Sequence, residues 1–131
     1  MSTGEAGPIK PLFWIGSSWK DLKAFPAGVR QTAGFALWQA QMGRKHVSAK
    51  VLKGFGGAGV LEVVEDDDGS TYRVVYTVKF AGAVYVLHAF QKKSKSGIKT
   101  PASEMGIVRR RLKAAEEHHA ARRREEGGRE N

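Results

Sequence analysis

Positively charged residues interrupt or end two hydrophobic segments of the sequence. Arg73 lies inside TYRVVYTVKF (71–80), and Lys92 and Lys93 directly follow VYVLHAFQ (84–91). An arginine side chain presents a planar fork that bonds two phosphate oxygens and stays charged. Neighbouring lysines add positive charge, and lysine is also a side chain that acts as a general base. These residue types in this spacing predict a site for a phosphate group.

Cleavage of RNA is one phosphate chemistry that such a site suits without a metal. The ribose 2′-hydroxyl attacks its own phosphate, so the site must supply a base, cations around the crowded phosphorane and a proton for the departing 5′-oxygen. The candidate catalytic residues are Arg73, Lys92, Lys50, Lys53 and His88, and the candidate RNA-binding residues are Lys79, Lys93, Lys95 and Lys99.

Two histidines are the candidate neutral proton carriers, His88 and His46. Regular alternation along the strand places His88 on one face with Val84, Val86 and Phe90. That placement favours a buried, structural histidine over a catalytic one. For His46 the sequence favours neither role.

The strands that carry these residues form a predicted antiparallel meander. Residues 60–65, 71–80 and 84–91 are apolar or alternating, and Asp68-Gly69 is a hairpin signal after the first of them. In the middle segment one face is entirely apolar, and the opposite face carries Arg73 and Lys79. We expect the apolar face to pack under helices and the second face to stay open as a ligand surface.

A short strand and two helices are predicted ahead of the meander. The strand is PLFWIG (11–16), and the first helix lies within SSWKDLKAFP (17–26), where a serine can cap it and Pro26 ends it. The second helix spans 28–43, and Phe35 and Trp38 widen its apolar stripe, so we expect it to be well buried.

A glycine-rich segment and a final helix complete the pattern. Residues 44–59 are predicted to be a mobile loop. The last helix has Thr100 as its cap and Pro101 in its first position. Its apolar stripe, which we expect to dock on the domain, consists of Met105, Val108, Leu112 and Ala115.

Composition limits the class of protein and the number of domains. The 131-residue chain suits one α+β domain at 12–116, after a flexible N-terminus at 1–11 and before a charged tail at 117–131 that we expect to fray. The absence of cysteine excludes disulfides and thiolate metal sites, and no metal or cofactor is predicted. With no signal peptide or membrane span in the pattern, we expect a cytoplasmic protein that does not contact membranes.

Charge favours a polyanionic partner. The formal net charge is +9, and residues 92–113 hold eight Lys or Arg against one acidic residue, Glu104. Such an excess attracts nucleic acid, although acidic proteins are attracted by the same charge.

The order strand, two helices, meander, basic loop and helix resembles the RelE/ParE superfamily of bacterial toxins. Within it, YRVVY…VYVLHAFQKKSKSGIKTP…RRRLK is similar to the HigB-like, phage-derived branch, over roughly residues 12–116. The resemblance implies a RelE-like fold, in which a small antiparallel sheet packs against two N-terminal helices and carries a C-terminal helix. It also implies the toxin of a type II toxin–antitoxin system, an endoribonuclease that cuts messenger RNA and inhibits translation and growth.

The resemblance further implies partners and residue roles. The partners are a cognate antitoxin, with a helix-turn-helix domain like HigA, messenger RNA and the ribosome, and DNA is reached only through the antitoxin. Arg73 holds the scissile phosphate and Lys92 is a second phosphate contact. The chain has Val64 where many relatives have an arginine, and Ile98 and Thr100 where some carry a tyrosine or histidine.

Two other functions fit the sequence. A toxin of the ParE type inhibits DNA gyrase and requires no arginine site centred on a phosphate. A basic nucleic-acid-binding protein without chemistry would use the positive charge of residues 92–113.

Overall fold

Five strands and three helices form in the part of the chain that the computed structural model describes, residues 8–92 and 99–130. In chain order they are β1 (Leu12–Trp14), α1 (Ser18–Lys23), α2 (Ala27–Gln41), β2 (Ala49–Val51), β3 (Val60–Asp67), β4 (Ser70–Thr77), β5 (Val84–Lys92) and α3 (Ala102–Glu130). None of these helices is long and apolar enough to cross a membrane.

The strands form one sheet in the order β1-β5-β4-β3-β2. β3, β4 and β5 are antiparallel neighbours, which confirms the predicted meander. β1 pairs in parallel with β5, and β2 pairs antiparallel with β3. β2 lies in the segment predicted to be a loop, and that prediction was wrong because the short strand precedes four glycines that dominate the local pattern.

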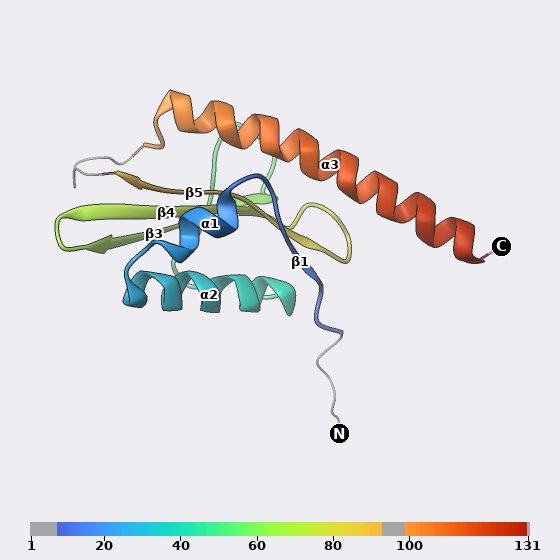
Figure 1. Ribbon diagram of the computed structural model, residues 1–131, viewed down its shortest axis with the longest axis horizontal. Coiled ribbons are helices and arrows are strands. Elements are labelled where there is room, and N and C mark those ends of the chain that lie inside the picture. Colours follow the sequence, from blue (N-terminus) through green and yellow to red (C-terminus); the bar gives the residue numbers. More distant parts are fainter. Residues whose placement is uncertain (1–7, 93–98, 131) are drawn as a thin grey trace, which may run out of the picture.

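Helices cover both faces of the sheet, and the predicted α+β class is confirmed (Figure 1). On one face α1 and α2 pack Leu22, Val29 and Leu37 into a core with Val74 and Tyr76 of β4. This is the apolar face that the alternation of β4 predicted.

The second face of the sheet is not open, contrary to our expectation. α3 lies across it (Figure 1), and its Val108 and Ala115 are fully buried in a second core with Val75, Tyr85 and Leu87. The expectation failed because Arg73 and Lys79 gave this face of the predicted strand a polar, solvent-exposed character. The apolar residues between and beside them still required burial. The apolar stripe predicted on the last helix is that cover.

A β-bulge in β5 reverses the alternation on which the placement of His88 depended. Val75 is opposite His88, but the next residue, Tyr76, is opposite Val86, so Leu87 is an extra residue. Leu87 packs in the α3-side core and His88 bonds to side chains of α3. His88 therefore lies on the α3 face, whereas Val86 packs under α1 and α2.

α3 continues to Glu130, although the sequence predicted fraying beyond residue 116. His118 explains part of the continuity: its Nδ1 is 2.7 Å from the Tyr85 hydroxyl, and its ring centroid is 4.7 Å from that of Phe13. Arg122 lies over the Phe13 ring at 4.8 Å. The tail lacks an apolar stripe, but aromatic contacts from the edge of the sheet hold its first turns.

The outer face of α2 departs from the expected burial. Phe35 is 50% exposed and Trp38 is 47% exposed, and their ring centroids lie 6.3 Å apart. The sheet accommodates only the stripe that contains Val29, Ala33 and Leu37, and no described element covers the opposite side of the helix.

Tyr76 gives the fold a predicted response to alkaline pH. It is fully buried, and its hydroxyl has no hydrogen-bond partner among the described residues. Burial raises the pKa of Tyr76 from its ordinary value of 10.0 to about 12. Because the unfolded chain loses this proton first, the stability that Tyr76 contributes is fully present below pH 10.0 and is lost as the pH rises to about 12.

The variant Tyr76→Phe tests this response. We expect its urea midpoint at neutral pH to equal or exceed that of the parent, because the lost hydroxyl has no partner. Above pH 10.0 the midpoint of the parent should fall more steeply than that of the variant. Equal losses in the two proteins would assign the alkaline transition to another group.

Candidate functional site

Arg73 lies at the centre of a buried polar cluster between the sheet and the start of α3. Its Nη1 is 3.0 Å from Oε1 of Glu62 and 3.4 Å from Oγ1 of Thr100. The Thr100 hydroxyl donates to the other Glu62 oxygen at 2.6 Å. Arg73 is only 2% exposed and Glu62 8% exposed. The guanidinium that we predicted as a phosphate ligand is thus engaged with protein groups under cover of α3.

The strand register explains why Glu62 is the partner. Arg73 is opposite Val64 on β3 and Phe90 on β5, so its two direct neighbours are apolar. Glu62 stands two residues along β3 on the same face, within diagonal reach of a long side chain. A buried arginine requires such a counter-charge, because an unpaired charge away from water is very costly.

Four exposed cations lie on the segments next to this cluster, and we call them the basic rim: Lys50, Lys53, Lys99 and Arg109. Lys50 on β2 is directly opposite Glu62 on the neighbouring strand β3, and Lys99 immediately precedes Thr100. Lys53 lies in the loop after β2, immediately before Gly54.

Contacts between that loop and α3 hold the remaining member of the basic rim in position. A Cβ placed on Gly54 would lie 3.5 Å from Cε of Met105 and 3.7 Å from Nη2 of Arg109. The Arg109 guanidinium also lies 5.6 Å from the centroid of the Phe55 ring. The glycine-rich loop therefore packs on α3, and Lys53 is carried next to Arg109.

The other predicted lysines are distributed differently. Lys92 ends β5 opposite Thr71, two residues beyond Phe90, and so shares the face of Arg73 while being half-buried. Lys79 lies two residues beyond the end of β4, and its Nζ is 3.4 Å from Oε2 of Glu116. Lys93 and Lys95 lie outside the described residues, and so does Ile98.

His88 is buried, as predicted, and is held at both ring nitrogens. Its Nε2 is 2.6 Å from Oε1 of Glu104, and its Nδ1 is 3.3 Å from Nη1 of Arg111. Because arginine only donates, Nδ1 accepts, and Nε2 carries the proton that is donated to the carboxylate. His88 thereby joins β5 to α3. A catalytic role for it stays a prediction.

Arg111 fastens three elements together behind His88. Its Nη1 donates to the Leu87 carbonyl at 3.0 Å, and its Nη2 donates to Oγ of Ser17 at 3.0 Å. Ser17 in turn donates to Asp21 at 2.7 Å. Burial lowers the pKa of the Arg111 guanidinium, and the negative charge of Asp21 partly offsets this decrease. The space for the guanidinium exists because residue 16 is glycine: a Cβ there would lie 2.7 Å from Nε of Arg111.

A shallow cleft of about 350 Å³ adjoins the His88–Glu104 pair, but the residues that line it do not suit a phosphate. Asp21 and Glu104 contribute two carboxylates to its lining, and Phe25 and Phe90 contribute apolar surface. A phosphate would meet negative charge there. The accessible positive charge lies at the basic rim instead.

Sequence reasoning missed Glu62 and Glu104 as members of these sites. The signal for Glu62 was present: it is the single acidic residue inside the apolar run VLEVV, on the strand next to Arg73. The signal for Glu104 depended on the bulge at Leu87, which turns His88 toward α3 and which no residue type in the sequence marks.

The other histidine candidate has a local structural role. His46 accepts a hydrogen bond at Nδ1 from the backbone N–H of Ser48, 2.9 Å away, and its ring lies edge-on to Phe35 with centroids 5.6 Å apart. It shapes the turn between α2 and β2, and no contact places it at the cluster of Arg73.

Residues 20–113 match the family described as Phage derived protein Gp49-like (DUF891). The match covers most of the chain, and the protein belongs to this family, which is associated with the RelE-like toxins of toxin–antitoxin systems. No curated protein and no solved structure gives a significant match. The matched range runs from α1 into α3 and contains the Arg73 cluster and the whole basic rim.

Proposed function

We propose that the protein is the toxin of a type II toxin–antitoxin pair, of the HigB-like branch, and cuts messenger RNA without a metal. Membership of the Gp49-like family supports a toxin. The observation that carries the ribonuclease is the basic rim, which sets four exposed cations on the segments next to the cluster of a strand arginine. Phosphates of an RNA strand are the ligands that such a set of cations attracts most strongly.

Each group has a proposed task in the reaction. The basic rim holds the RNA backbone, and Arg73 binds the scissile phosphate when the structure opens at Thr100 and uncovers the buried Arg73–Glu62 pair. A lysine of the rim is the candidate general base that takes the proton of the 2′-hydroxyl, since an arginine does not lose its proton. A second, protonated lysine of the rim is the candidate acid that gives a proton to the departing 5′-oxygen. Lys92, on the face of Arg73, adds a second charge toward the phosphorane.

Paired variants test the basic rim without disturbing the core. Lys50→Gln with Lys53→Gln removes two exposed charges at the rim, and Arg44→Gln with Lys45→Gln removes two exposed charges at the end of α2. We expect the first pair to reduce cleavage roughly tenfold or more, and the control pair to leave it unchanged. The readout is the frequency of new 5′ ends in messenger RNA after induction in bacteria, at matched protein levels.

Different outcomes would lead away from this proposal. Equal cleavage by both pairs would remove the rim from the RNA site. Growth arrest without any new 5′ ends would point to a protein target, such as the gyrase inhibited by ParE-type toxins. Neither arrest nor cleavage would leave a basic binding protein with a toxin-like fold.

The proposed partners follow from the same function. The antitoxin, messenger RNA and the ribosome are the partners of a toxin of this kind. A net charge of +9 favours an antitoxin whose contact surface is acidic.

A further inference from the structure

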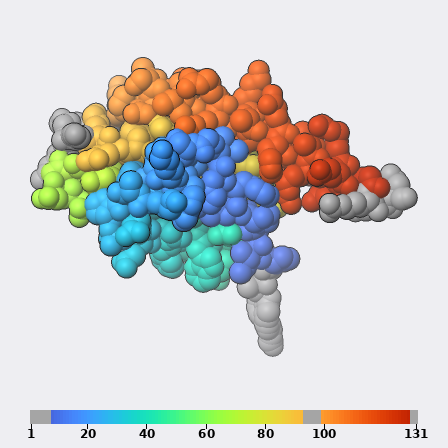
Figure 2. Space-filling view, viewed as in Figure 1, coloured from blue at the N-terminus to red at the C-terminus, as the bar shows by residue number. Residues whose placement is uncertain are grey.

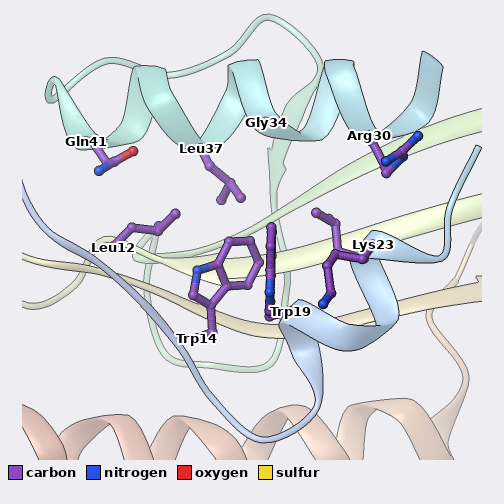
Figure 3. Close-up of a pocket in the computed structure, with 9 residues that line it drawn as sticks. Leu12, Trp14, Trp19, Lys23, Arg30, Gly34, Leu37 and Gln41 are labelled. Atoms are coloured by element: carbon purple, nitrogen blue, oxygen red, sulfur yellow. The ribbon is translucent and has the colours of Figure 1, made fainter. Parts of the chain in front are cut away.

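An apolar groove of about 280 Å³ lies between α1, α2 and β1 (Figure 3). It is on the α1–α2 side of the sheet, whereas Lys50 of the basic rim and Glu62 of the Arg73 cluster face the α3 side. Its walls are mainly aliphatic and aromatic, with Leu12, Trp14, Leu22 and Leu37 among them. α1 and α2 lie side by side at this surface (Figure 2). We call this feature the α1–α2 groove.

One glycine keeps the groove open. Gly34 lies in the middle of α2 and lines the groove, and a Cβ placed on it would meet no atom within 4 Å. Glycine inside a helix costs roughly 0.5–1 kcal/mol relative to alanine. The helix therefore carries a residue that weakens it at a position that lines the groove, where a side chain would occupy free space.

The two cations that line the groove lie at the same end of it. Lys23 and Arg30 lie together there, while Leu12 and Gln41 lie at the other end (Figure 3). Nζ of Lys23 is also 5.2 Å from the centroid of the Trp19 ring. A bound segment would therefore contact apolar walls along the groove and two cations at one end of it.

The apolar surface around the groove exceeds what the fold itself requires. Trp19, Phe35 and Trp38 are each about half exposed, at 47%, 50% and 47%. Phe35 and Trp38 were expected to be well buried in the second helix, and no described helix or strand covers them. Trp19 lines the groove, whereas Phe35 and Trp38 lie on the outer face of α2 and outside the groove lining. Exposed apolar surface of this kind is typical of protein–protein contact.

We propose that the α1–α2 groove docks an acidic segment of a partner protein, which inserts a large apolar side chain beside Gly34 and pairs its carboxylates with Lys23 and Arg30. The inference rests on the proposed function in one respect, because the segment would belong to the antitoxin. It adds the docking surface and the chemistry of the docked segment, at a place remote from the basic rim.

Charge and ring geometry favour this occupant over two others. A second copy of the chain would also carry +9, so its approach is opposed by like charge. Single-stranded RNA would need open ring faces for stacking. Trp19, however, is packed against Trp14 at 4.8 Å and lies under the ammonium of Lys23.

Selection from a library of random short peptides on the purified full chain tests the proposal. We expect the enriched peptides to combine a Trp, Phe or Leu with flanking Asp or Glu. Their affinity should fall roughly tenfold or more on the variant Gly34→Trp, which fills the groove. Circular dichroism and a thermal melt establish that this variant is folded.

A charge reversal supplies the second test, and it does not depend on filling the groove. On Lys23→Glu with Arg30→Glu, the same library should yield peptides rich in Lys or Arg instead. The matched control reverses two exposed charges of α3, Arg110→Glu with Lys113→Glu, and should still select acidic peptides.

Several results would overturn the docking proposal. These are no enrichment, enriched peptides that bind the groove-filled variant equally well, or unchanged selection after charge reversal in the groove. Displacement of the peptides by a short single-stranded RNA that no longer binds Gly34→Trp would assign the groove to RNA. Because these are binding measurements, their failure leaves messenger RNA cleavage untouched, and a failure of cleavage leaves them interpretable.

Discussion

Replacing Arg73 with alanine is expected to lower the free energy of unfolding by about 3–5 kcal/mol, because Glu62 then stays buried with an uncompensated charge. Arg73 and Glu62 are 2% and 8% exposed, so water cannot take over the lost interaction without opening the structure. Urea unfolding followed by far-ultraviolet circular dichroism measures the loss. A change this large is a substantial part of the stability of a domain of this size.

The double variant Arg73→Met with Glu62→Met is the control for this prediction. An apolar pair of similar volume removes both charges, and buried ion pairs are often replaced in this way with little or no loss of stability. We expect the double variant to regain most of the stability that Arg73→Ala loses. If Arg73→Ala unfolds at the same urea concentration as the parent, the pair is hydrated and the buried cluster described above is incorrect.

This expectation bears directly on activity measurements in cells. A loss of toxicity in Arg73→Ala alone could reflect a lower concentration of folded protein rather than a lost phosphate contact. A stable double variant that fails to cut messenger RNA would separate the two explanations.

Arg111→Met is expected to produce the second large loss, about 3 kcal/mol. The arginine satisfies the carbonyl of Leu87, at the bulge where the sheet ladder is interrupted, and it also bonds Ser17. Each buried polar group left unsatisfied costs about 1–3 kcal/mol, and at least the carbonyl would be left without its donor. Thermal and urea unfolding of the purified protein give the change.

The neighbouring residue offers a matched control, because Arg110 is exposed on the same helix. Arg110→Met also replaces an arginine with methionine and removes the same charge. It is expected to change the free energy of unfolding by no more than about 0.5 kcal/mol. Similar losses in the two variants would show that α3 depends on its charge and not on the bonds of Arg111.

The order of the elements other than β2 was predictable because each of them has a strong local signal. Alternation in β4, the Asp68-Gly69 turn and the apolar stripe of α3 all correspond to elements of the structure. The second layer of helix could have been deduced as well, since the α3 stripe needed an apolar surface and the other face of the sheet was already taken by α1 and α2. Arg73 and Lys79 obscured this by making the face look polar.

The candidate site was less predictable because it depends on pairing between distant segments. Glu62, Arg73 and Thr100 meet through the register of β3 and β4 and the docking of α3, which no local pattern encodes. The Leu87 bulge has the same character, since it moves His88 to the other face without a glycine to mark it. Phe35 and Trp38 show a different failure. Their hydrophobic side chains predicted burial, but no helix or strand among the described residues covers them.

The parallel pairing of β1 with β5 has a consequence for how the chain acquires its fold. Leu12 finds its partner only at Val84, so β1, α1 and α2 leave the ribosome long before the strand that they must join. Contacts of such long sequence separation form slowly, because the entropy of closing the loop is lost before they contribute. A chain broken off before Val84 lacks the partner of β1 and the cover of Arg73, and cannot complete either layer. The sheet is therefore completed only after β5 has been synthesised.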